Sequence, residues 1–128
     1  MGKHSVLVAI LDDEEPVRTA FARLFHSADF QAETFGSGQE FLDSLNSHLP
    51  DCLVLDLHLP GLTGLDIVQQ IVGRKLPIPI VMITGHDMPG LKERALSAGA
   101  RAYLLKPLDD TTLIQAVASC TQNDNVSD

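Results

Sequence analysis

Basic residues are scarce in this chain. Among its 128 residues, Lys and Arg number 9 against 17 Asp and Glu, which gives a formal net charge of -8. Such an excess of acid disfavours direct binding to nucleic acid or to anionic lipid, because both attract positive charge. It is compatible with cations, with basic partner proteins and with a site that concentrates carboxylates. The positions of the acidic residues therefore matter more than their number.

Cysteine is also scarce, and long hydrophobic runs are absent. The two cysteines, Cys52 and Cys120, are too few for a disulfide framework or a zinc motif, and we interpret each as a small buried or half-buried thiol. No apolar stretch approaches the roughly 20 residues of a membrane-spanning helix. The N-terminal residues lack a signal-peptide pattern, and Val6 stands where a myristoylation signal requires Ser or Thr. We therefore expect a cytoplasmic protein without a membrane partner.

The residues that are present suffice for one globular domain. Hydrophobic residues make up 45% of the chain, which is typical of a folded protein of this length. Four short apolar runs are continuous rather than alternating, as in parallel strands that helices cover on both faces. A fifth, more polar run at 31–35 fits an edge strand. The four continuous runs are 6–11, 52–55, 80–83 and 102–105.

Segments with helical period alternate with these strands. The first runs from Val17 to Ala28 and has Pro16 in its first turn, and the second begins with a capping box of Ser37 and Glu40. The expected apolar stripes of the other three are Leu65, Val68, Ile71 and Val72; Leu91, Ala95, Leu96 and Ala98; and Leu113, Ala116, Val117 and Cys120, with Asp109 or Asp110 as the last cap. Five alternations predict a doubly wound α/β fold, whose sites form at the carboxyl ends of the strands.

Every expected strand except the polar one is followed by a residue that could form a site. Asp12 and Asp13 follow the first run, and Asp56, Thr84 and Lys106 follow the other three. Each alone could be a cap, a turn residue or a surface lysine, but together they predict one cluster. Carboxylates about 4 Å apart repel by about 4 kcal/mol at an effective dielectric of 20, so such a cluster takes up protons or holds a cation. Oxygen ligands favour Mg2+ or Mn2+, and the whole set suits phosphoryl transfer onto an Asp.

Four short motifs carry a resemblance to a known family. In chain order they are Ile-Leu-Asp-Asp-Glu at 10–14, Leu-Asp-Leu-His-Leu-Pro-Gly-Leu-Thr-Gly at 55–64, Ile-Thr-Gly at 83–85 and Leu-Leu-Lys-Pro at 104–107. Over about residues 5–120 the chain resembles the CheY-like receiver domain of two-component response regulators. The sequence around these motifs most resembles that of FixJ-type receivers, which usually precede a helix-turn-helix DNA-binding domain.

The resemblance implies a flavodoxin-like (βα)5 fold with a five-stranded parallel sheet of order 2-1-3-4-5 flanked by five helices. It assigns residues 1–121 to the receiver and leaves 122–128 as a polar tail or the start of a linker. It also implies that Asp56 accepts a phosphoryl group from a phosphohistidine of a sensor kinase, and that Lys106 and Thr84 hold the phosphoryl oxygens. The expected Mg2+ ligands are Asp12, Asp13, Asp56 and the backbone carbonyl of His58. The Lys106–Pro107 peptide bond is expected to be cis.

Thr84 and Tyr103 stand at the switch positions of the family. Phosphorylation is expected to draw Thr84 inward, after which the Tyr103 ring can turn inward too. This would reshape the face formed by the last two helices and the strand at 102–105, which by resemblance controls an output domain or partner and can form a homodimer. In the alternative, Tyr103 is a half-buried strand residue with its hydroxyl in water.

Two histidines near the expected site have open roles, and two other classes of protein remain as alternative functions. We interpret His58 and His86 as exposed loop residues, while a sharper hypothesis is that they tune water access and the lifetime of an aspartyl phosphate. A transition-metal site is not enforced by their spacing. An aspartate-based phosphatase or phosphotransferase remains open, although such enzymes typically place an acid where His58 stands. A pseudo-receiver that binds without switching is disfavoured because all five site positions match.

Overall fold

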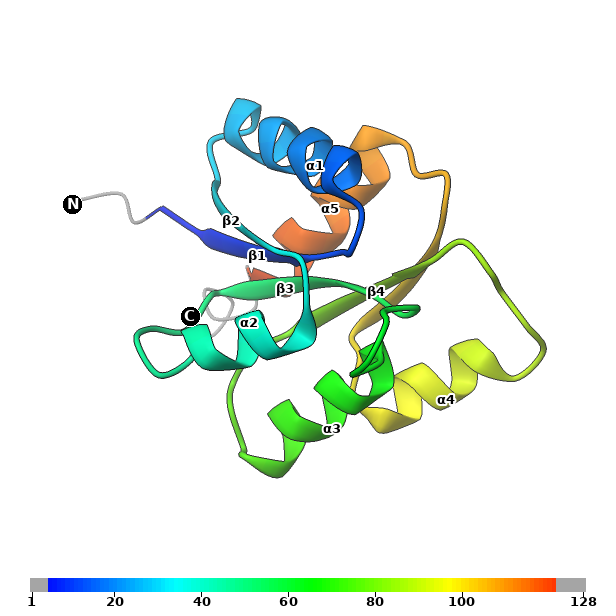
Figure 1. Ribbon diagram of the computed structural model, residues 1–128. Coiled ribbons are helices and arrows are strands. Elements are labelled where there is room, and N and C mark those ends of the chain that lie inside the picture. Colours follow the sequence, from blue (N-terminus) through cyan, green and yellow to red (C-terminus); the bar gives the residue numbers. More distant parts are fainter. Residues whose placement is uncertain (1–4, 122–128) are drawn as a thin grey trace, which may run out of the picture.

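The computed structural model describes residues 5–121, in which five strands and five helices alternate along the chain (Figure 1). The strands are β1 (Leu7–Leu11), β2 (Gln31–Phe35), β3 (Cys52–Asp56), β4 (Ile80–Thr84) and β5 (Ala102–Leu105). The helices are α1 (Glu15–Ser27), α2 (Gly38–Ser44), α3 (Gly64–Gly73), α4 (Leu91–Ala98) and α5 (Asp110–Thr121). All strand pairs are parallel, and the order is β2-β1-β3-β4-β5. The predicted fold class and strand order are confirmed, and β2 lies at an edge as expected.

Helices cover both faces of the sheet, which explains the continuous apolar runs in its strands. Successive residues of a strand point to opposite faces, so β1, β3 and β4 each contribute to two core clusters. One cluster lies under α1 and α5 and includes Val8, Ile10, Val54, Val81, Phe25, Leu113 and Val117. The other lies under α2, α3 and α4 and includes Leu11, Leu55, Met82, Phe41, Ile67, Ile71 and Leu91. Figure 1 shows these two helical layers with the sheet between them.

The apolar stripes of α3 and α4 differ from the predicted ones. In α3 the buried face is Gly64, Ile67, Val68 and Ile71, so the prediction missed Ile67. Val72 was expected inside but is 52% exposed, because it lies at the edge of the buried face in the last turn of α3. Leu96 of α4 was expected inside as well and is 39% exposed.

The helix ends follow from local hydrogen bonds. Ser37 caps α2 by accepting the backbone N–H of Glu40, but the Glu40 carboxylate bonds to Gly36 rather than back to Ser37, so the predicted capping box is only half formed. Asp109 caps α5 by accepting the backbone N–H of Thr112. The Lys106–Pro107 peptide bond is cis, as expected. Within the described range, no helix is long and apolar enough to cross a membrane.

Candidate functional site

The polar residues that the sheet buries lie at its carboxyl edge. Among the described residues, the buried polar side chains are Asp12, Asp56 and Thr84, which are 0%, 6% and 0% exposed. Asp12 follows β1, Asp56 ends β3 and Thr84 ends β4, while Lys106 follows β5. Because parallel strands end at the same edge, four segments far apart in sequence meet there. The structure thus brings the predicted residues together.

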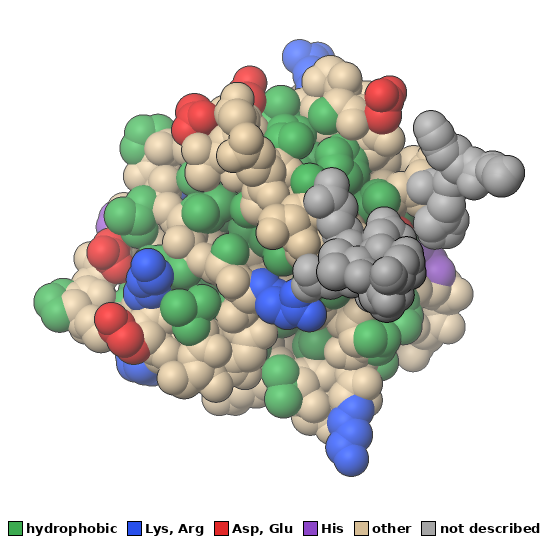
Figure 2. Space-filling view, turned by 180° about the vertical axis from the view of Figure 1, so that it is seen from behind, with side chains coloured by type: hydrophobic (Ala, Val, Ile, Leu, Met, Phe, Trp, Pro, Cys, Tyr) green, Lys and Arg blue, Asp and Glu red, His purple; other side chains and the backbone are tan. Residues whose placement is uncertain are grey.

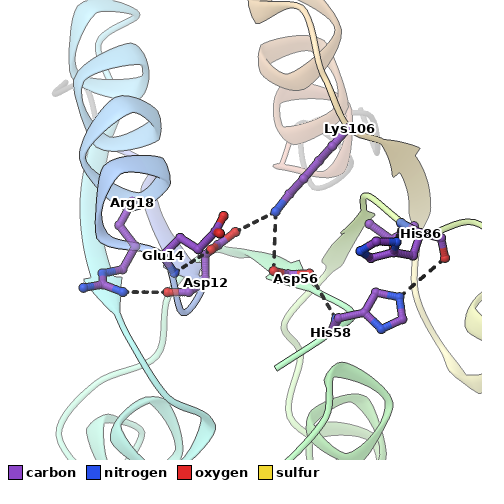
Figure 3. Close-up of polar contacts among 8 residues, drawn as sticks. Asp12, Glu14, Arg18, Asp56, His58, His86 and Lys106 are labelled. Carbon is purple, nitrogen blue, oxygen red and sulfur yellow. Dashed lines mark hydrogen bonds and ion pairs between the residues drawn. The ribbon is translucent and has the colours of Figure 1, made fainter. Parts of the chain in front are cut away.

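Lys106 ties two of the acids together, as Figure 3 shows. Its Nζ lies 3.1 Å from Oδ2 of Asp12 and 3.4 Å from Oδ2 of Asp56. The more exposed Asp13 completes the group, since oxygens of all three carboxylates lie within 4.8 Å of one another. Three carboxylates and one ammonium leave an excess of negative charge at this edge.

Backbone groups fix the orientation of the two buried acids. The backbone N–H of His58 donates to Oδ1 of Asp56 at 3.0 Å, and that of Glu14 donates to Oδ1 of Asp12 at 2.9 Å. The guanidinium of Arg18 in α1 donates to the backbone carbonyl of Asp12 at 2.8 Å. These bonds hold the carboxylates toward Lys106 and limit their rotation (Figure 3).

Burial and charge act in opposite directions on the ionisation of this pair. Burial raises the pKa of Asp56 above its ordinary value, and Asp12 adds to this, although the N–H of His58 and the charge of Lys106 oppose it. Burial alone would lower the pKa of Lys106, but its hydrogen bond to Asp12 and the charges of both acids outweigh this, so the pKa is raised. Lys106 is therefore a fixed positive charge, and Asp56 is a more basic carboxylate than one in water.

The cluster has the composition of a site for a hard divalent cation. Its donors are oxygens, and their excess negative charge is what Mg2+ or Mn2+ neutralises. Over residues 5–121, Asp12, Asp13 and Asp56 are the group of side chains so arranged. The two nearby histidines do not belong to it. Their exposed rings contact each other edge to face at 5.4 Å between centroids, and Nε2 of His58 lies 3.5 Å from the backbone carbonyl of His86.

Thr84 and Tyr103 each have a defined hydrogen-bond partner. Oγ1 of Thr84 accepts the backbone N–H of His86 at 3.0 Å, which leaves the hydroxyl hydrogen free to donate elsewhere. The hydroxyl of half-buried Tyr103 donates to Oδ1 of Asp87 at 2.8 Å. Tyr103 is thus a half-buried strand residue, as in the alternative interpretation, and its hydroxyl has a carboxylate partner. Burial and this carboxylate raise the pKa of Tyr103 to about 12.

Sequence reasoning missed two residues that shape the site. One is Asp87, whose side chain holds the Tyr103 hydroxyl from the loop between β4 and α4. The other is Gly64, where an added Cβ would lie 2.7 Å from the backbone oxygen of Asp56 and 2.7 Å from Cα of Leu57. The signal available for the glycine was its place directly after Thr63, which caps α3 with a full capping box.

This strand order with helices on both faces is that of a CheY-like receiver, and the comparison with known families agrees. Residues 8–118 match the family model described as the response regulator receiver domain. The chain belongs to this family.

Two curated relatives are similar to this chain over most of its length. The chain is 37% identical to Nodulation protein W of Bradyrhizobium diazoefficiens over 118 aligned residues. The alignment covers 92% of this chain and 52% of that protein. It is 32% identical to the transcriptional regulatory protein FixJ of Rhizobium meliloti over 116 residues, or 91% and 57% of the two chains. The chain thus spans about half the length of these curated relatives.

Solved receivers superpose closely on the structure. A response regulator receiver protein from Burkholderia phymatum is 40% identical, with a TM-score of 0.82 over 91% of this chain and 95% of that one. The structure of FixJ-N is 31% identical, with a TM-score of 0.86 over 94% and 96% of the two chains. Both agree with the strand order and the helical layers described above.

Proposed function

We propose that this chain is a phosphorylation-controlled receiver in which Asp56 accepts a phosphoryl group from a phosphohistidine of a sensor histidine kinase. The observation that carries the proposal is the buried Asp56 carboxylate, held by the N–H of His58 and lying 3.4 Å from the Lys106 ammonium. A carboxylate with a raised pKa, a fixed cation and a free hydroxyl hydrogen from Thr84 are the groups that such a transfer uses.

In this mechanism an oxygen of Asp56 attacks phosphorus while the bond between phosphorus and the histidine nitrogen of the kinase breaks. The Lys106 ammonium exchanges its partner during the transfer. It leaves the Asp56 carboxylate and pairs with a phosphoryl oxygen, which requires only a small movement of the side chain. The Thr84 hydroxyl donates its free hydrogen to another phosphoryl oxygen. Bound Mg2+ would neutralise charge on the transferring group, and the residues proposed to hold it are Asp12, Asp13, Asp56 and the His58 carbonyl.

The proposed switch couples Thr84 to Tyr103. A phosphoryl group adds charge and acceptor oxygens, so Thr84 is drawn toward Asp56 and the following loop moves with it. That loop carries Asp87, which holds the Tyr103 hydroxyl. Release of this bond frees the ring to turn inward. Exposed Leu96 and Leu105 on α4 and β5 then give the α4–β5–α5 face apolar contacts for an output domain, a partner protein or a second copy.

An apolar groove beside the site supports a docking place for the kinase. It has a volume of about 470 Å³ and lies between Val17, Ala20 and Phe21 of α1 and the segment after β5 that contains Pro107 and Leu108. Lys106 contributes to its lining, so an apolar stripe of a kinase helix seated there would place its histidine near Asp56. The proposed compartment is the cytoplasm.

The proposed output is transcriptional. Two of the relatives named above are a nodulation protein and a transcriptional regulatory protein, and this chain matches 52% and 57% of their lengths. A DNA-binding output domain, rather than this chain, would contact DNA. Figure 2 supports this division, because Lys and Arg side chains on the visible face are separate and interspersed with acidic ones.

Phosphorylation with a small donor tests the proposal. Incubation with acetyl phosphate and MgCl2 should add one phosphoryl group to the wild type, seen by intact-mass spectrometry, and beryllofluoride should block this addition. Asp56→Asn should gain nothing, while Asp43→Asn on exposed α2 should behave as wild type. A phosphoryl group on Asp56→Asn at the wild-type rate would overturn the assignment. Rapid release of phosphate over many turnovers would instead favour a phosphatase.

A further inference from the structure

Two cysteines meet at the end of the sheet opposite the acidic cluster. Cys52 is the first residue of β3 and is 0% exposed, while Cys120 lies in the last turn of α5 and is half-buried. Helix α5 packs over β3, and both thiols belong to the core cluster between them. The two side chains are close enough to shift each other's pKa. Their separation of 68 positions matches no cysteine motif, so only the fold brings them together.

One thiol of the pair faces a hollow and the other is sealed behind it. A hollow of about 840 Å³ opens at this end of the sheet, and its lining includes Cys120, Arg101, Thr121 and Val6. Cys52 is not part of that lining and lies inside the core. A small solute that enters the hollow therefore reaches Cys120 first, with Cys52 as the next sulfur inward.

The surroundings divide the roles of the two sulfurs. The contact with Cys120 and burial raise the pKa of Cys52, so Cys52 keeps its proton. The neighbouring Cys52 thiol lowers the pKa of Cys120, and the charge of Arg101 acts in the same direction. The C-terminal end of a helix disfavours a negative charge, and the Cys52 thiol and the Arg101 charge offset that disadvantage. Cys120 is the nucleophilic sulfur of the pair.

We propose that Cys120 and Cys52 form a hydroperoxide-reactive dithiol that closes to an intramolecular disulfide. The Cys120 thiolate attacks one oxygen of hydrogen peroxide, the O–O bond breaks, and a sulfenic acid forms with release of hydroxide, which takes up from solvent the proton that Cys120 had lost and becomes water. The Cys52 sulfur then attacks the sulfenic sulfur, the S–O bond breaks, and the hydroxyl leaves with the Cys52 proton as a second water. The two thiols lose two electrons in total, and one hydrogen peroxide becomes two molecules of water.

The product would join the last turn of α5 to the first residue of β3. Since α5 borders the face on which the output is proposed to act, oxidation would fix one end of that helix to the sheet. This modification lies at the far end of the sheet from Asp56 and does not depend on its phosphorylation. The proposed dithiol can therefore be tested independently of the proposed function.

Peroxide treatment followed by peptide mapping tests the dithiol. The full chain is treated with hydrogen peroxide and digested without reductant. The expected product is a monomer that has lost two hydrogen atoms and yields a linked peptide pair containing Cys52 and Cys120. Cys52→Ala should stop at a sulfenic acid on Cys120 that dimedone traps, whereas Cys120→Ala should leave Cys52 unmodified. Circular dichroism establishes that each variant is folded.

Rates supply the second criterion and guard against variants that fail to fold. Cys120 of the folded wild type should react about tenfold faster than in the urea-unfolded chain, because the thiolate fraction is larger. Arg101→Gln should slow the reaction, and Arg94→Gln on exposed α4 should leave it unchanged. Equal rates in the folded and unfolded chain, or disulfides only between molecules, would overturn the proposal.

Discussion

Neutralising Asp56 should stabilise the protein in the absence of divalent cations. The charge of Asp56 lies 3.4 Å from Lys106, an attraction of about 5 kcal/mol at an effective dielectric of 20. Repulsion from Asp12, with oxygens within 4.8 Å, amounts to about 3.5 kcal/mol on the same scale. Burying a carboxylate costs several kcal/mol more. Because repulsion and burial together exceed the attraction, Asp56→Asn should raise the free energy of unfolding by about 2 kcal/mol.

The stability difference between the wild type and Asp56→Asn should depend on pH. Burial raises the pKa of Asp56 in the folded chain, so stability linked to this group is fully present below the unfolded carboxyl pKa of about 3.9 and is lost as pH rises through the folded value. Wild type and Asp56→Asn should therefore be equally stable in acid and should diverge toward pH 7. Adding MgCl2 should narrow the gap, because the cation stabilises the wild type more than the variant.

Urea and thermal unfolding at pH 7 in EDTA measure the effect. A gain of about 2 kcal/mol corresponds to about 8 °C in Tm for a chain of this size. Asp43→Asn removes the same charge from an exposed position of α2 and should change stability by less than about 0.5 kcal/mol. If Asp56→Asn is no more stable than the wild type in EDTA, the balance of charges derived for this site is wrong.

Three further substitutions probe separate contacts. Lys106→Met should lower the free energy of unfolding by about 3 kcal/mol, measured in urea, because it leaves two buried carboxylates unpaired; an unchanged midpoint would contradict the ion pairs. Asp87→Asn should lower the pKa of Tyr103 from about 12 toward 10.0, and phenolate absorbance reports this cleanly since the chain has one Tyr and no Trp. Gly64→Ala should cost about 1–3 kcal/mol, because its Cβ would meet the backbone of Leu57 at 2.7 Å; Gly73→Ala, which meets nothing, is its control.

The strands and the grouping of the site residues could be predicted because both depend on simple periodicities. Continuous apolar runs marked the covered strands, and the more polar run at 31–35 indeed forms the edge strand. Since parallel strands end together, the residues after them had to share one edge, and the structure confirms that Asp12, Asp56 and Lys106 do so. Their chemical roles stay predictions, as does the assignment of residues 122–128, which lie outside the described range.

Contacts between side chains of different loops could not be predicted in this way. The bond between Asp87 and Tyr103 joins a loop to a strand, and no repeat along the chain marks it. The contact of Cys52 with Cys120 depends on how α5 is seated over β3. Ile67 was missed for a related reason, because choosing between neighbouring apolar positions requires the rotation of α3 about its axis.

The bond between Lys106 and Asp12 joins residues 94 positions apart in the sequence. Its two ends belong to a central strand and to the edge strand on the far side of the sheet, so they meet only after β3 and β4 have been inserted between them. During synthesis from the N-terminus, Asp56 therefore emerges from the ribosome well before the lysine that completes its surroundings. A nascent chain that ends before β5 contains every acid of the site and still lacks the ammonium group that pairs with two of them. The complete charge cluster therefore forms only when the whole sheet has been assembled.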